Sequence, residues 1–286
     1  MEETRAVMYL AWCTDIHLDF IDDPGEAAIR RHFSRLFARE VVDGLIVSGD
    51  VSLSQSVTRH LSALSQTLRI PIYFVLGNHD FYGGSFDSVR SGVTATSDSD
   101  PHLVYLTNED VVSLTPTVAL VGHDGWYDAA AGRPGGSMMM NDWVKISDYR
   151  DVVLRPVPGG ATILIDEVIR LSREFADAAT REILRKSELA AESHRNVLVV
   201  THVPPFPQVH VDNPKTSSPE TMPWYTSHVL GTALLGLAAR RPDTRFDVFC
   251  GHTHGLRDLR VAPNLVCHVG GSKYGSPDIV GTIRIS

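Results

Sequence analysis

Aspartate, asparagine and histidine, residue types that bind metal ions, gather in short clusters along the chain. In order, the clusters read Asp15-Ile16-His17, Gly49-Asp50, Gly77-Asn78-His79-Asp80, a single His202, and Gly251-His252-Thr253-His254. A ligand set that mixes imidazole, carboxylate and amide oxygen suits Zn, Fe or Mn better than Mg or Ca. The residue types therefore predict a transition-metal site, provided that the fold brings the clusters together.

The spacing within the clusters supports a shared site. Residues two apart in an extended chain point to the same side. Asp15 and His17 can thus face one site together, and so can His252 and His254. Glycine precedes three of the clusters, which permits tight turns and close approach of the backbone.

Short apolar runs precede all five clusters: Val7–Cys13, Gly44–Ser48, Ile70–Leu76, Asn196–Thr201 and Arg245–Cys250. Their length and β-rich composition predict buried strands. Between the first three, Glu26–Glu40 and Ser54–Leu68 carry apolar residues at helical spacing, so βαβ units and a parallel sheet are expected. Sites in open α/β sheets lie beyond the carboxyl ends of the strands. The five clusters should therefore meet in one place.

The remaining sequence predicts more strands and one segment that interrupts the alternation of strands and helices. Further strands are expected at Leu103–Leu106, Val118–Gly122, Leu256–Val261, Asn264–Val269 and Ile279–Ile285. The stretch Gly132–Gly160, with five glycines and three prolines, is interpreted as a long irregular insertion. Ala161–Ser193 is predicted to be one long helix. Because the candidate ligands are spread from Asp15 to His254, a single domain over residues 1–286 is favoured.

Two interpretations of the insertion are open. Long loops in compact domains are often active-site lids, and Trp143, Lys145, Tyr149 and Arg150 could stack on a base or bind a phosphate. Alternatively, the segment is a surface loop packed by its own Met and Trp residues. Every candidate ligand lies outside it, so metal binding is not expected to depend on it.

The ordered set DxH, GD, GNHD, H, GHxH resembles the calcineurin-like metallophosphoesterases over residues 15–254. Single motifs of this kind occur often by chance. The ordered set of five motifs, each of which follows a predicted strand, is a specific signature of the family. The resemblance implies an α/β fold with two packed mixed β-sheets flanked by helices, a four-layer sandwich. It also implies two divalent or mixed-valence transition-metal ions (Mn, Fe or Zn). Asp15, His17 and His254 would hold one ion, Asn78, His202 and His252 the other, and Asp50 would bridge them.

The resemblance also implies the reaction, which is in-line attack on a phosphoester by a hydroxide that bridges the metals. His79 would bind substrate and protonate the leaving group, while Asp80 would either orient His79 or simply cap the turn. Ser/Thr protein phosphatases of this superfamily typically show an Arg soon after GD, and GNHE. Here Val51-Ser52-Leu53-Ser54 follows Asp50, and residue 80 is Asp. The phosphodiesterase-like branch, with a small phosphodiester or nucleotide as substrate, is therefore favoured. The alternatives are a phosphomonoesterase, a nuclease, or a non-catalytic scaffold, which is expected to have lost ligands.

The composition of the chain indicates which classes of binding partner are expected. The chain has 286 residues and a formal charge of −8, and it shows no Lys/Arg run, so duplex nucleic acid is not an expected partner. Two divalent ions would outweigh Asp15 and Asp50 and leave a cationic pocket for a phosphate ester. Three cysteines without a CxxC pair indicate no disulfide framework, and Cys250 reads as a core thiol. The apolar run near the N-terminus is too short for a signal sequence or a membrane span, which favours a cytoplasmic location without a membrane partner.

Overall fold

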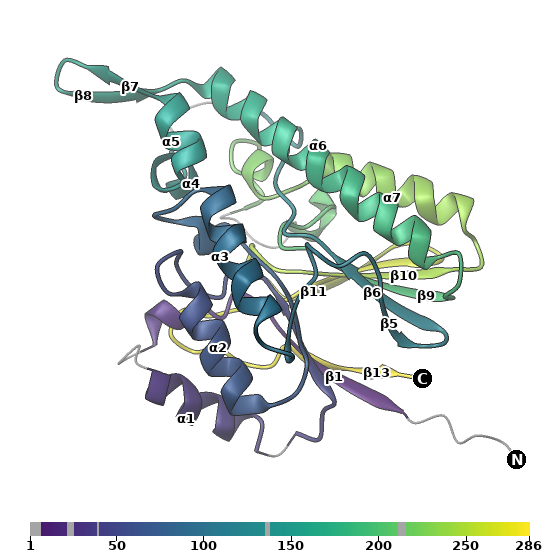
Figure 1. The fold of residues 1–286 in the computed structure, drawn as a ribbon. Coiled ribbons are helices and arrows are strands. Elements are labelled where there is room, and N and C mark those ends of the chain that lie inside the picture. Colours follow the sequence, from purple (N-terminus) through teal and green to yellow (C-terminus); the bar gives the residue numbers. More distant parts are fainter. Residues whose placement is uncertain (1–6, 22–25, 39, 135–137, 211–215) are drawn as a thin grey trace, which may run out of the picture.

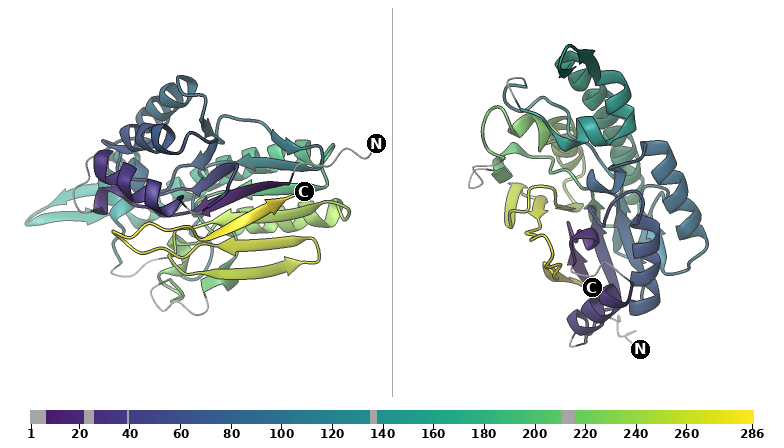
Figure 2. Two further views of the ribbon diagram at one scale, coloured as in Figure 1. Left: turned by 90° about the horizontal axis from the view of Figure 1, so that it is seen from below. Right: turned by 90° about the vertical axis from the view of Figure 1, so that its left-hand side faces the viewer.

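The structure, a computed structural model, describes residues 7–21, 26–38, 40–134, 138–210 and 216–286 (Figure 1). Two mixed β-sheets pack face to face, with strand orders β13-β1-β2-β3-β4 and β11-β12-β10-β9-β6-β5. Helices cover the outer faces of both sheets (Figures 1 and 2). The predicted fold class, two packed mixed sheets flanked by helices, is confirmed.

The first sheet has four parallel strands and one antiparallel edge strand. These are β1 (Met8–Cys13), β2 (Gly44–Ser48), β3 (Ile72–Val75), β4 (Leu103–Tyr105) and the antiparallel β13 (Gly281–Ile285). Helices α1 (Glu26–Leu36), α2 (Val57–Leu68) and α3 (Phe86–Asp98) lie on its outer face. The predicted βαβ units are therefore present in the N-terminal half.

The second sheet also has four parallel strands, with one antiparallel strand at each of its two edges. The parallel strands are β6 (Val118–Gly122), β9 (Asn196–Val200), β10 (Arg245–Cys250) and β12 (Leu265–Val269), and the edges are β5 (Val112–Thr115) and β11 (Arg257–Ala262). Helices α6 (Ile165–Ala190) and α7 (His228–Arg240) cover its outer face. Cys250 is buried in this layer, as predicted.

Alternating side chains of the central strands build the core. In β2, Leu45 and Val47 pack under the helices of the first sheet, whereas Ile46 points to the second sheet. There Ile46 shares a cluster with Leu198 and Phe249 of the opposite sheet. Strands that are covered on both faces must be apolar throughout, which is why they read as continuous apolar runs.

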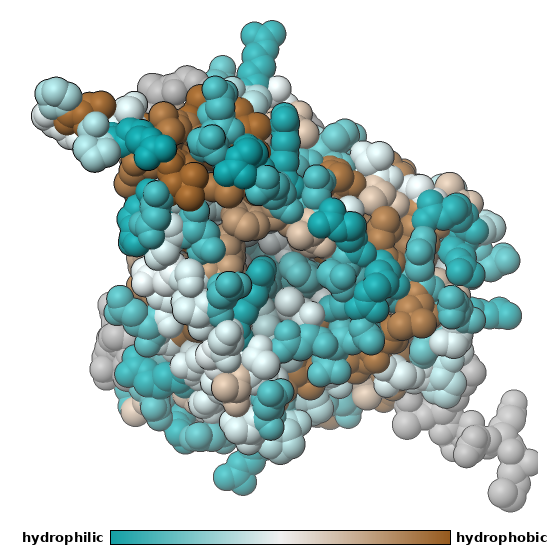
Figure 3. Space-filling model, turned by 45° about the horizontal axis from the view of Figure 1, so that its top comes forward, coloured by the Kyte–Doolittle hydropathy of each residue, from teal (hydrophilic) through white to brown (hydrophobic). Residues whose placement is uncertain are grey.

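The insertion is not irregular in its described part, so that prediction is wrong. It contains α4 (Asn141–Lys145), α5 (Ser147–Val153) and a projecting hairpin of β7 (Leu154–Val157) and β8 (Gly160–Ile163), while residues 135–137 lie outside the described residues. The predicted helix from Ala161 accordingly begins only at Ile165. Figure 3 shows hydrophobic side chains gathered at the base of the hairpin.

Two aromatic side chains of the insertion are core residues rather than lid residues. Trp143 and Tyr149 are 1% and 0% exposed, so neither can stack on a substrate base. The Tyr149 hydroxyl accepts a hydrogen bond from Trp126 Nε1 at 2.7 Å and bonds Ser172 of α6 at 2.8 Å. The segment is thereby packed against α6 and the loop that follows β6.

Asp124, which follows β6, connects both sheets directly behind the strand ends. Its buried carboxylate accepts hydrogen bonds from Leu76 N (2.9 Å), the Thr107 hydroxyl (2.8 Å) and Arg90 Nε of α3 (2.9 Å). Its carbonyl oxygen accepts the backbone N–H of His202 at 3.1 Å. Burial alone would raise the pKa of Asp124, but Arg90 and these donors hold it below its usual value.

We expect Asp124→Asn to lower the free energy of unfolding by about 2 kcal/mol at pH 7, because the buried carboxylate loses its charge-assisted hydrogen bonds, including the one from partly exposed Arg90. The folded-state pKa lies below the unfolded one, so this contribution is complete above about pH 4 and is lost as the pH falls through the folded value. Urea denaturation of both proteins between pH 3 and pH 7 measures this loss.

The matched control is Asp151→Asn, which removes an exposed pair with Arg150 at 2.8 Å. Exposed pairs contribute little, so the change should stay below about 0.5 kcal/mol. Equal, small losses in both variants would contradict the role assigned to Asp124.

Candidate metal centre

The five sequence clusters meet at the carboxyl ends of β1, β2, β3, β9 and β10. Backbone hydrogen bonds tie neighbouring loops together: Asp15 N and His17 N donate to Gly49 O and Asp50 O, both at 3.0 Å. The N–H of His252 donates to Asp15 Oδ1 at 3.0 Å and so joins the loops of the two sheets. The expected convergence is therefore what the structure shows.

The loops that carry these side chains are conformationally strained. Seven non-glycine residues of the described chain have positive φ, and five of them are candidate ligands: Asp15 (47°), His17 (40°), Asp50 (53°), His252 (68°) and His254 (55°). Such backbone costs roughly 1–3 kcal/mol per residue and concentrates at functional sites. A Cβ on Gly77 or Gly251 would collide with the carboxylate of Asp50 or Asp15, so these two positions require glycine.

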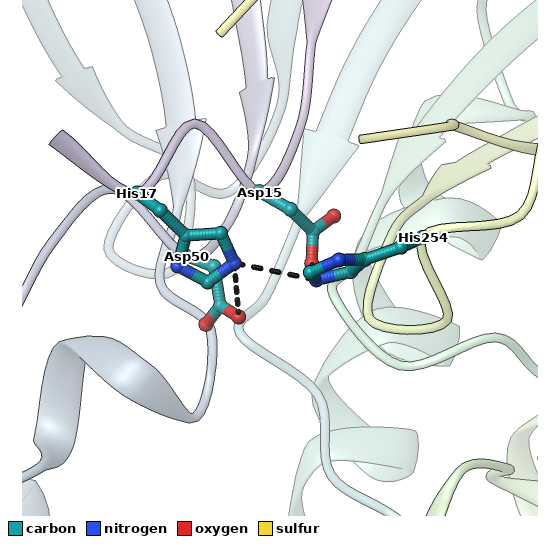
Figure 4. Close-up of side chains that lie close together, drawn as sticks. All are labelled: Asp15, His17, Asp50 and His254. Atoms are coloured by element: carbon teal, nitrogen blue, oxygen red, sulfur yellow. Dashed lines mark hydrogen bonds and ion pairs between the residues drawn. The ribbon is translucent and has the colours of Figure 1, made fainter. Parts of the chain in front are cut away.

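The first group of side chains consists of Asp15, His17, Asp50 and His254 (Figure 4). One ligand atom from each lies within 4.8 Å of all the others. His254 Nε2 is 3.2 Å from Asp15 Oδ1 and 3.3 Å from His17 Nε2, which is 3.6 Å from Asp50 Oδ2. Ligand atoms that share an ion at about 2.0–2.2 Å stand about 3–3.5 Å apart, so these residues fit one metal position.

The second group surrounds Asn78 Oδ1. That oxygen lies 3.1 Å from His202 Nε2 and 3.0 Å from His252 Nδ1. The other nitrogen of each ring faces a backbone carbonyl, Ser48 O at 2.9 Å for His202 and Trp224 O at 3.1 Å for His252. Both neighbours of each ring are acceptors, so the single proton of a neutral ring can satisfy only one of them; with that proton on the carbonyl side, the free lone pair of each ring faces Asn78 Oδ1. Acceptors that face one another in this way need a cation between them, and this group therefore fits a second metal position.

Burial keeps the imidazoles neutral. It lowers the pKa of His17 and of His252 to about 3, and the pKa of His202 is lowered for the same reason. Neutral imidazole is the form that binds metal.

The carboxylates make the site acidic. Burial by itself would raise the pKa of Asp15, but the hydrogen bond from His254 and the surrounding histidines bring it below its usual value. Burial, Asp15 and Asp80 together raise the pKa of Asp50. Uncharged rings around two buried carboxylates are an arrangement that bound cations stabilise.

Asp80 does not orient His79, so that prediction is wrong and the turn-capping alternative holds. Its carboxylate accepts backbone hydrogen bonds from Ser52 N (2.7 Å), Gly77 N (2.9 Å) and Val51 N (3.2 Å). Burial raises the pKa of Asp80 to about 7. Because residues 79–81 form a 3-10 turn, neighbours in sequence point in different directions.

His79 itself lies beside the first group. Its backbone N–H donates to Asp50 Oδ1 at 2.9 Å, and its ring lies 4.6 Å from that of His17 and 4.4 Å from that of Tyr82, between centroids. Nδ1 has no hydrogen-bond partner among the described residues. The partly exposed ring is thus placed at the mouth of the site without a protein group that fixes its tautomer.

Asp142 is a site residue that the sequence did not reveal. Fully buried in α4, it accepts hydrogen bonds from Asn78 Nδ2 at 2.8 Å and from the Tyr82 hydroxyl at 2.6 Å. Because Nδ2 is held there, the amide oxygen of Asn78 must face His202 and His252. Every candidate ligand lies outside the insertion, but the hydrogen bond between Asn78 and Asp142 gives the insertion a direct contact with one of them. No motif marks Asp142, which follows no strand.

Comparison with known proteins fits this geometry. The family model described as calcineurin-like phosphoesterase matches residues 8–256, and the chain belongs to that family. It is accordingly a metal-dependent phosphoesterase, as the sequence motifs predicted. No curated protein gives a significant match.

Two solved structures share the fold over nearly their whole length. Phosphopantetheinyl hydrolase from Mycobacterium tuberculosis superposes with a TM-score of 0.60 at 16% identity, covering 96% of both chains. A dimetal phosphatase from Danio rerio superposes with a TM-score of 0.57 at 17% identity, covering 96% of this chain and 91% of its own. Identities this low establish the common fold alone. Among the described residues, no helix has the length and apolar character needed to cross a membrane.

We expect Asp142→Ala to weaken metal binding at the Asn78 position by about 10- to 100-fold, since Asn78 loses the partner that fixes its amide. Titration of the metal-free protein with Mn²⁺ and Zn²⁺ measures this affinity, and circular dichroism checks the fold.

The control for this prediction is Asp148→Ala in the same insertion. It loses a carboxylate that accepts Phe86 N at 2.9 Å and has no recorded contact with Asn78. Equal metal affinity in the two variants would show that Asp142 does not act through Asn78.

Proposed function

We propose that the chain hydrolyses a small phosphodiester or nucleotide at a binuclear centre of Mn, Fe or Zn. Asp15, His17 and His254 would hold one ion, and Asn78, His202 and His252 the other. The observation that carries this proposal is the position of Asp50. Its Oδ2 lies 3.6 Å from His17 Nε2 in the first group, and its Oδ1 lies 3.4 Å from His202 Nε2 in the second. One carboxylate can thus serve both ions.

When bound, the two ions lower the pKa of water and neutralise charge on the phosphoryl oxygens. The side chains position the reacting groups and supply the proton for the leaving group. Asp50 fixes the two positions relative to each other and holds the backbone of His79. The His79 ring, at the mouth, donates a proton to the departing oxygen. Burial lowers its pKa to about 3 in the chain alone, and the negative charge of a bound phosphate favours the protonated ring.

A small diester or nucleotide is favoured by the residues after the GD motif. Where the protein phosphatases have an Arg soon after GD, this chain has the uncharged run Val51-Ser52-Leu53-Ser54. That segment has no basic side chain that could bind the phosphate of a phosphoprotein. A non-catalytic scaffold is disfavoured because no ligand of the family pattern is missing.

The first test is Asp50→Asn, combined with metal analysis of the purified protein. The wild type should retain two ions per chain and hydrolyse members of a panel of phosphomonoesters, linear diesters, cyclic nucleotides and oligonucleotides. The variant should lose metal from both positions and at least about 100-fold in turnover, because a ligand common to both groups is weakened.

Asp166→Asn, at the exposed start of α6, is the control and should retain both ions. Two retained ions with normal turnover in Asp50→Asn would sink the binuclear proposal. Activity confined to monoesters would overturn the substrate class and leave the centre intact.

The second test is His79→Ala. The variant should keep its metals and lose about 10²- to 10⁴-fold in rate on alkyl esters, whose poor leaving groups need protonation. A nitrophenyl ester, whose leaving group needs no proton, should lose much less. A series of leaving groups of graded pKa measures the difference.

His194→Ala is the control, since that partly exposed ring bonds Ser113, Ser193 and the carbonyl of Ala190 and makes no recorded bond to a candidate ligand among the described residues. A uniform loss across the leaving-group series would argue against proton donation by His79.

A further inference from the structure

Exposed aromatic side chains are rare in this protein and unevenly placed. Among the described residues, three are more than one-third exposed: Tyr9 (38%), Tyr274 (45%) and Phe20 (50%). Single exposed rings need no explanation. Phe20 and Tyr274, however, contact each other with ring centroids 4.7 Å apart, although they are 254 positions apart in sequence. A pair of this kind indicates a surface built for contact.

The pair lies at the mouth of the first ligand group. The ring of Tyr274 is 4.4 Å from that of His17, 4.9 Å from that of His254 and 6.2 Å from that of His79, between centroids. Phe20 lies further out, 6.0 Å from His17. His17 is completely buried beneath them. The two rings therefore extend from the ligands toward solvent on the side where His79 and His254 remain partly exposed.

Both rings are held in place by short contacts to the ligand loops. Phe20 ends the 3-10 turn Leu18–Phe20 directly after His17. Tyr274 lies in the loop between β12 and β13, where the Ser272 hydroxyl donates to Asp15 O at 2.6 Å. Gly275, with φ of 73°, lets this loop pass close to the carbonyl of Phe20. The surface is thus organised before any substrate binds.

We propose that Phe20 and Tyr274 form the binding site for the nucleobase of a nucleotide ester, an inference that rests on the proposed function. If the phosphate lies on the metal centre, the next group of the substrate must extend outward past these rings. A stacking site requires aromatic surface that is open to solvent, and both residues have it. Flat, polarisable aromatic rings stack on the planar face of any nucleobase. Insertion residues Trp143 and Tyr149 cannot take this part, because they are buried.

The test uses two substrates with the same reacting bond, the methyl phosphodiesters of adenosine 5′-phosphate and of ribose 5-phosphate. In the wild type, kcat/KM for the adenosine ester should exceed that for the ribose ester by about tenfold, as stacking of one base allows. Phe20→Leu and Tyr274→Leu should each reduce this ratio at least fivefold through KM. Tyr274→Phe, which keeps the ring, should preserve it.

Tyr9→Leu is the matched control, because it removes an exposed ring far from the site and should leave the ratio as in the wild type. Metal content is measured for every variant, so that a ratio is compared only between fully loaded proteins. A ratio near one in the wild type, or an unchanged ratio in both leucine variants, would overturn the stacking site. In that case, hydrolysis of the ribose ester would still support the proposed function. If the wild type hydrolyses neither ester with Mn²⁺, Fe²⁺ or Zn²⁺, the proposed function fails, and the stacking site fails with it.

Discussion

The rest of the structure depends on one electrostatic constraint, the burial of Asp15 and Asp50 side by side. Each is at most 1% exposed, and their ion-pair partners among the described residues are histidines, two of which, His17 and His202, have a pKa that burial lowers. Unpaired buried charge costs several kcal/mol, and the left-handed backbone at both positions adds to that cost. The buried apolar clusters of the two sheets hold in place the loops that carry these residues. Asp80 and Asp124 behind them satisfy loop N–H groups that no strand could reach.

Much of this arrangement could be predicted because buried parallel strands appear in the sequence as continuous apolar runs. The bounds of β2, β6 and β10 agree with the apolar runs residue for residue, since both faces of these strands are covered. The convergence of the candidate ligands followed from the rule that strand ends share one edge of a sheet. Ordered motifs after such strands carry the family relationship, which the match to residues 8–256 confirms.

What could not be predicted depends on contacts between distant segments. Helix α3 is rich in Ser, Thr and Asp and shows weak apolar periodicity, and it is held by burial of Phe86, Val89 and Val93. Asp142 reaches Asn78 across 64 positions, a pairing that only the packed insertion defines. The error over Asp80 has a local cause, because a 3-10 turn separates the directions of adjacent side chains. The resemblance that suggested the orienting role carries no information on these side-chain directions.

The hydrogen bond between Asp15 and His252 has a consequence for how the protein matures. It joins residues 237 positions apart, so neither metal position exists until the first and second sheets have docked. Contacts of such long range are closed late and slowly in folding. Partly folded chains offer only scattered ligands, and metal ions therefore bind the native state selectively. At a free metal concentration 1,000 times Kd, this selectivity adds about 4.1 kcal/mol to stability. Bound metal therefore stabilises only the completely assembled chain.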